Sequence, residues 1–157
     1  MEGQQKYQTF EDLDTYKAAR EFRKEMYAVT RRLPDFEKFE LASQIRRAAV
    51  SLTNNIAEGH GRFHYLDQIK FMLQSRGSLE ELQDDLNICE DEKYLPPVEV
   101  AKLKGDAECV HKILNGYIRY LRGCKADQPE VLHDQARTQP EDFLDDELNL
   151  FLTPATL

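Results

Sequence analysis

Seven polar and charged residues in the middle of the chain are the best candidates for binding chemistry. Arginine binds phosphate and carboxylate groups through paired hydrogen bonds, so closely spaced arginines favour an anion-binding surface or a contact between subunits. The alternative is a set of ordinary surface arginines that pair with Glu58 or Glu80. The candidates, which we assign to a nucleic-acid-binding surface or a subunit interface, are Arg46, Arg47, Asn54, Asn55, Glu58, Arg62 and Arg76.

Two adjacent asparagines, Asn54 and Asn55, lie inside this segment. Asparagine weakens a helix interior because its side chain competes for backbone hydrogen bonds. The pair therefore favours a buried polar network with Glu58, which would fix the helix register or an interface between subunits. The alternative is a solvated helix face with low helix propensity.

No arrangement of residues in the sequence indicates catalysis. There is no Gly-rich phosphate loop, no G-x-S-x-G turn and no Cys/His pair with supporting context. Glu108 and His111 have the Glu-x-x-His spacing that di-iron bundles use twice, but the sequence holds one copy. His60 and His64 lack partners at the spacing of a zinc site. We predict a protein that is not an enzyme and has no metal or cofactor.

The segment 41–62 contains one of four predicted helices, over about residues 41–59. Its apolar residues recur at steps of three and four, which places them on one helical face. Gly59 and Gly61 are predicted to end the helix, because glycine tolerates the left-handed conformation found after a helix. The apolar face consists of Ile45, Ala48, Ala49, Leu52 and Ile56.

The same spacing predicts helices over about 13–32, 65–92 and 98–122. Gly77 weakens the third of them by about 1 kcal/mol relative to alanine, which indicates close contact with a neighbour. Short connections favour antiparallel neighbours, so we predict an all-α, antiparallel up-down-up-down four-helix bundle. The predicted core consists of Ala19, Phe22, Met26, Ile45, Leu52, Leu79, Leu82, Leu86, Val110, Leu114 and Leu121.

Three motifs carry a resemblance to a known family: SQIRRAAVS at 43–51, NIAEGHGR at 55–62, and Phe71 followed after five residues by GSLEEL at 77–82. Together, over about residues 10–122, the chain resembles the four-helix-bundle proteins encoded by intervening sequences of 23S ribosomal RNA genes. That family also includes the accessory (variability determinant) proteins of diversity-generating retroelements. The resemblance implies a homo-oligomer, with a pentamer as the leading stoichiometry, assembled through the polar side of the bundle.

The charge of the chain is unevenly distributed. Its net charge of −8 argues against a broad basic surface for nucleic acid. Residues 125–157 hold eight acidic and two basic side chains, a net charge of −6, so residues 1–124 carry only −2. This nearly neutral part has room for a local basic patch.

Other features of the composition favour a cytoplasmic protein. No apolar run approaches the ~20 residues of a membrane span, so we expect no membrane partner. The first residues, MEGQQKYQ, lack the apolar stretch of a secretion signal. The three cysteines, at positions 89, 109 and 124, follow no disulfide or metal pattern, which favours reduced thiols.

We predict two regions, a four-helix bundle over 1–124 and an acidic linker with an amphipathic tail segment over 125–157. Within 141–152, acids stand near the start of a predicted short helix, where the helix dipole favours them. We predict that its apolar face docks in a groove of the bundle or on another protein. A disordered tail is the alternative, because isolated short helices are marginal in water. The predicted docking residues are Phe143, Leu144, Leu148, Phe151 and Leu152.

Two functions follow from these patterns and from the resemblance. The first is a non-catalytic, ring-forming homo-oligomeric scaffold or adaptor, whose main partner is a second copy of itself. The second is a nucleic-acid-binding accessory protein that acts with RNA or DNA beside a reverse transcriptase. The retroelement members of the family are markedly basic, whereas this chain is acidic, so the scaffold is the preferred expectation.

Overall fold

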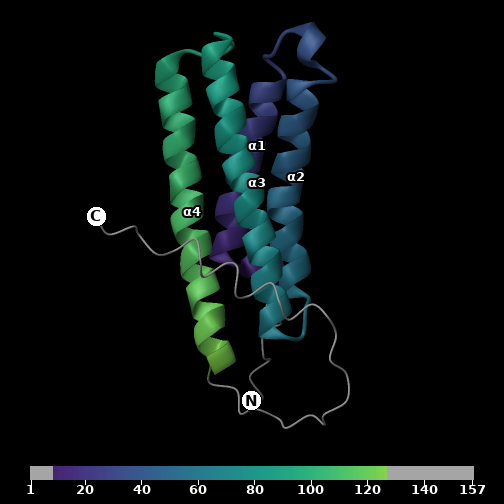
Figure 1. Ribbon diagram of the computed structural model, residues 1–157, viewed down its shortest axis with the longest axis vertical. Helices are drawn as coiled ribbons and strands as arrows, with labels where there is room; N and C mark the ends of the chain where they lie inside the picture. The colour runs from purple at the N-terminus through teal and green to yellow at the C-terminus, as the bar shows by residue number, and fades with distance from the viewer. Residues whose placement is uncertain (1–8, 127–157) are drawn as a thin grey trace, which may run out of the picture.

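The structure is a computed structural model that describes residues 9–126. Four long helices pack side by side (Figure 1), and residues 9–126 contain no strand. This confirms the predicted all-α bundle. None of the helices in this part of the chain is long and apolar enough to cross a membrane. In chain order the elements are the short 3-10 helix η1 (Phe10–Asp12), α1 (Asp14–Thr30), the 3-10 helix η2 (Asp35–Glu37), α2 (Leu41–His60), α3 (Tyr65–Asp91) and α4 (Pro97–Ala126).

Each helix packs against two neighbours. α1 contacts α2 and α4, and α3 contacts the same two helices, so α1 is diagonal to α3 and α2 is diagonal to α4. The connections between successive helices, residues 31–40, 61–64 and 92–96, are short, which makes sequence neighbours antiparallel. The observed bounds lie within a few residues of the predicted ones, and the largest difference is at α4, which continues to Ala126.

The core is one apolar cluster along the length of the bundle, and every residue predicted for it is buried. The structure corrects one position of the pattern on α4. The heptad spacing of Val110, Leu114 and Leu121 passes through Tyr117, whereas Ile118 is buried there and Tyr117 is only partly buried. A straight helix has 3.6 residues per turn, so its inward face drifts by about 20° per heptad.

Gly59 does not end α2 in the way the sequence suggested. The helix continues to His60, and no glycine among residues 9–126 has a positive φ. Gly59 is instead needed for close packing of α2 on α3. A Cβ atom at this position would lie 2.6 Å from Cε of Met72 and 2.8 Å from Cβ of Phe71. Any larger side chain would therefore push the two helices apart.

Polar side chains also form hydrogen bonds between α2 and α3. Ser75 Oγ donates to the backbone carbonyl of Leu52 at 2.7 Å, and the hydroxyls of Ser78 and Ser51 lie 2.9 Å apart.

One buried polar group lacks such a partner. Asp85 of α3 is 3% exposed, and its Oδ2 atom has no hydrogen-bond partner among the described residues. A buried carboxyl group without a partner is costly, because it has lost the hydration of its charged form.

Candidate binding groove

A groove lies on the solvent side of α1 and α2. It consists of two hollows of about 470 Å³ and about 500 Å³, which share Tyr27 of α1 and Val50 of α2. We call it the α1–α2 groove. Its lining residues are Arg23, Lys24, Tyr27 and Arg31 of α1 with Arg46, Arg47, Val50, Ser51, Asn54 and Asn55 of α2.

The groove follows from the spacing of residues on two antiparallel helices. On each helix its residues recur at steps of three and four, which places them on one face. The partly buried ring of Tyr27 and the half-exposed side chain of Val50 supply the apolar part of the surface. Arginines and asparagines surround them, so the groove combines an apolar centre with a basic border.

The arginines of the groove hydrogen-bond to neutral groups. Arg23 donates to Oγ1 of Thr53 at 2.8 Å, Arg46 to the carbonyl of Lys38 at 2.9 Å, and Arg47 to Oγ of Ser43 at 2.9 Å. Within residues 9–126, neither these three nor Arg31 has a carboxylate within 4 Å. Their positive charge is therefore not neutralised in the bundle and favours an anionic ligand.

Four of the seven predicted site residues meet in this groove, namely Arg46, Arg47, Asn54 and Asn55. Asn55 donates to the carbonyl and hydroxyl oxygens of Ser51, which links it to Ser78 of α3. Asn54 and Glu58 are exposed, however, so the described subunit alone does not bury the predicted network of Asn54, Asn55 and Glu58. Both residues lie on the outward face of α2, so their side chains contact solvent.

The other three predicted residues lie elsewhere. Arg62 pairs with Glu58 near the end of α2, and its guanidinium stacks 4.8 Å from the centre of the Phe71 ring. Arg76 of α3 donates to Oδ1 of Asn115 at 3.1 Å and joins α3 to α4. Arg62 therefore behaves as an ordinary surface arginine that pairs with Glu58, which was the alternative to a binding role. Arg76 is held by a hydrogen bond to Asn115 and does not line the groove.

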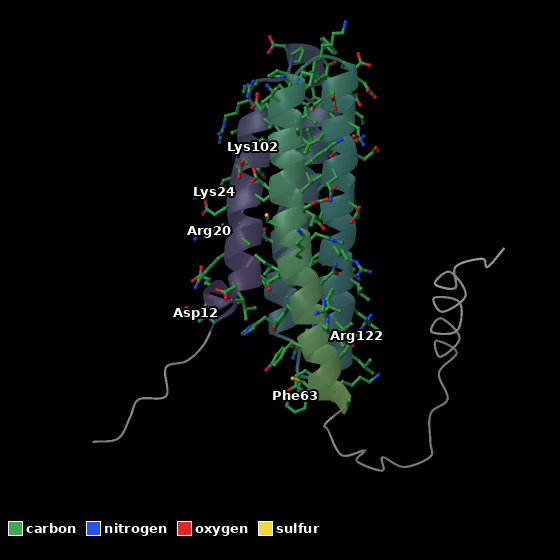
Figure 2. All side chains as sticks on the ribbon, turned by 90° about the vertical axis from the view of Figure 1, so that its left-hand side faces the viewer. Asp12, Arg20, Lys24, Phe63, Lys102 and Arg122 are labelled. Atoms are coloured by element: carbon green, nitrogen blue, oxygen red, sulfur yellow. The ribbon has the colours of Figure 1, made fainter. Side chains whose placement is uncertain are left out.

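The sequence interpretation missed the contribution of α1 to the groove. Arg23, Lys24, Tyr27 and Arg31 recur at steps of three and four on the polar face of the first predicted helix. That face was a detectable signal, but only the packing of α1 on α2 shows that it borders Arg46 and its neighbours. Among the four, Lys24 is paired with Glu21 at 3.0 Å and projects away from the bundle (Figure 2).

The residues considered for a metal site do not gather. His111 lies 3.3 Å from Glu80 and beside Asn115, whereas Glu108 is exposed. Residues 9–126 hold no group of three or more His, Cys, Asp or Glu side chains that is close enough to bind a metal ion.

A second surface lies on α4, the helix that faces the viewer in Figure 2. Exposed uncharged residues recur along it at helical spacing. Nothing lies within 4 Å of a Cβ atom built at Gly105 or Gly116, and Tyr120 is 62% exposed. Gly77 on α3 likewise has open space around it, so its predicted close neighbour is not another part of the described chain. We call the stripe of Val98, Gly105, Cys109, Ile113, Gly116 and Tyr120 the α4 stripe.

The protein is therefore a small four-helix bundle with a basic groove on its surface. The family model of the 23S rRNA-intervening sequence protein matches residues 11–116, which cover α1, α2, α3 and most of α4. The chain belongs to this family. A search of curated proteins found no match. The predicted tail residues Phe143, Leu144, Leu148, Phe151 and Leu152 lie outside the described residues.

Proposed function

We propose that the protein is a non-catalytic homo-oligomeric scaffold or adaptor that forms a ring through the α4 stripe and presents the α1–α2 groove to an acidic partner. α2 lies diagonally opposite α4, so contact through α4 leaves the groove accessible. A ring requires each subunit to offer two different patches to its neighbours. The surface around Gly77 on α3 is the second patch in this proposal.

The open glycines of α4 are the observation that carries the proposal. A glycine inside a helix costs about 1 kcal/mol relative to alanine, and its usual benefit is the close approach of another backbone. Gly105 and Gly116 are not approached by any part of the described chain. Exposed apolar side chains accompany them, with Val98 83% exposed and Ile113 39% exposed. Contact with a second copy would explain both features.

The groove supports the non-catalytic part of the proposal. None of its lining residues is a histidine, cysteine, aspartate or glutamate. These residue types supply most general bases and many nucleophiles in enzymes. A groove lined by arginine, lysine, asparagine, serine, tyrosine and valine has the chemistry of a binding surface.

Replacing Gly116 by leucine tests the interface. Leucine favours a helix over glycine by about 1 kcal/mol, so the subunit should keep its helix content. The added side chain should block close contact along the α4 stripe and lower the mass measured by sedimentation velocity. Ala28→Leu, at an exposed position of α1, is the matched control and should leave the mass unchanged. An unchanged mass for Gly116→Leu would contradict the proposed interface.

The four arginines of the groove favour a second candidate function, binding of nucleic acid as an accessory protein of a reverse transcriptase. Arginine contacts with phosphates release counterions, and an aromatic ring such as that of Tyr27 stacks on bases. Binding of nucleic acid would use only the arginine side chains and the Tyr27 ring that already line the groove.

Its test is a titration of single-stranded RNA at two salt concentrations. Arg46→Glu combined with Arg47→Glu should weaken binding by about tenfold or more at low salt, and the salt dependence of the remaining binding should be smaller. Lys70→Glu combined with Arg122→Glu changes the net charge equally at exposed sites outside the groove and is the control. Equal loss in both double variants would reject a specific role of the groove.

A further inference from the structure

The α1–α2 groove carries positive charge in a chain whose net negative charge lies mostly outside the described bundle. Its arginines have no carboxylate partner within residues 9–126, whereas residues 125–157 carry −6 of the net charge of −8. We propose that residues 141–152 of the same chain occupy the α1–α2 groove. This inference rests on the proposed role of the groove as a binding surface and names its resident ligand.

The chemistry of the segment matches that of the groove. Residues 141–152 read EDFLDDELNLFL, in which acidic side chains stand beside large apolar ones. The acids have unneutralised partners in Arg46 and Arg47, and in Arg23 and Arg31 across the groove. The apolar side chains have the surface of Tyr27 and Val50. A ligand with phosphate groups alone would use only the basic border.

Two other exposed faces of the bundle favour the segment less. The solvent side of α3 carries exposed acids at Glu80, Glu81 and Asp84, which would repel an acidic segment. The α4 stripe is uncharged and gives its acids no partner. Charge complementarity therefore favours the groove over these two surfaces.

The length of the chain between the bundle and the segment permits this contact. Figure 2 shows Arg122 of α4 at the same end of the bundle as Asp12, just before α1. From the start of α1 at Asp14 to Tyr27 the helix rises about 20 Å, at ~1.5 Å per residue. Residues 127–140 can span about 46 Å at ~3.3 Å per residue. This stretch is therefore long enough for the segment to reach the groove of its own subunit.

Occupancy of the groove by the chain itself has a regulatory consequence. An external anionic partner would have to displace residues 141–152, and the apparent affinity of the full chain would fall by the fraction of grooves that are occupied. The net negative charge of the whole chain would then be compatible with a basic binding surface, because the acidic segment would be the part that occupies this surface.

Limited proteolysis of the full chain by chymotrypsin tests the contact, because Phe143 and Phe151 are sites for this protease. Cleavage of a docked segment depends on the population of its undocked form. Arg46→Glu combined with Arg47→Glu should raise the cleavage rate at both sites by about tenfold. The double variant Lys70→Glu/Arg122→Glu should cleave at the wild-type rate. Circular dichroism of each variant checks that the helices are intact.

Reversing the charges of the segment as well as those of the groove provides a second test of the contact. Adding Asp145→Arg and Asp146→Arg to the groove variant should restore slow cleavage, because the pairs are re-formed with opposite signs. Equal cleavage rates in the wild type and all variants would overturn the inference. Sedimentation of the same samples separates the two proposals: an oligomer with an unprotected segment rejects only the docking. A monomer whose segment is protected rejects only the scaffold.

Discussion

Replacing Leu82 by alanine is expected to lower the free energy of unfolding by about 2–5 kcal/mol. Leu82 has 0% of its surface exposed, on the inward side of α3. Its removal leaves a cavity, because the surrounding helices relax only partly. Urea denaturation of the full chain measures the loss. The control is Leu66→Ala on the same helix, where the leucine is 47% exposed and a smaller loss is expected. A loss below about 0.5 kcal/mol for Leu82→Ala would show that this position does not carry the core.

Replacing Asp85 by asparagine is expected to stabilise the protein at pH 7.5 by about 1–3 kcal/mol. Burial, with smaller contributions from Glu81 and Asp84, raises the pKa of the Asp85 carboxyl group to about 6. The folded protein therefore favours the protonated form, and Asp85 costs stability as the pH rises from about 4 to about 6. Asparagine has no charge to bury.

The pH dependence separates this cause from a change in packing. The stabilisation by Asp85→Asn should be present at pH 7.5 and should vanish near pH 3, below the ordinary Asp pKa of 3.8, where Asp85 is protonated in the folded and unfolded states. Thermal denaturation at both pH values measures it. Asp84→Asn, at an exposed neighbouring position, should change the stability little at either pH. An equal gain from Asp85→Asn at both pH values would contradict the assigned pKa shift.

The fold was predictable because local pattern and packing agree in a helical bundle. The spacing of Ile45, Leu52 and Ile56 defines one face of α2, and an antiparallel bundle buries four such faces with short connections. Tyr117 shows the limit of the pattern, since a heptad assigns it to the core and the helical period moves Ile118 there. Gly59 shows another, because a glycine that permits close packing looks in sequence like one that ends a helix.

The candidate site was predictable only in part, because residues that are close in sequence lie on different faces of the bundle. Arg46 and Arg47 are in the groove. Arg62 follows the end of α2, where it pairs with Glu58 and stacks on Phe71 of α3. The partners from α1, such as Arg23 and Arg31, are more than ten residues distant in sequence and are brought to the groove by packing. Tertiary contacts, which no local pattern encodes, decide this arrangement.

The proposed assembly is tested most directly by the mass of the unmodified full chain in solution. The subunit mass is 18.3 kDa. Sedimentation velocity at micromolar concentration should give a single species at a multiple of that value, with five subunits the expected number from the family resemblance. A species of 18.3 kDa, unchanged as the concentration is raised through the micromolar range, would contradict the scaffold.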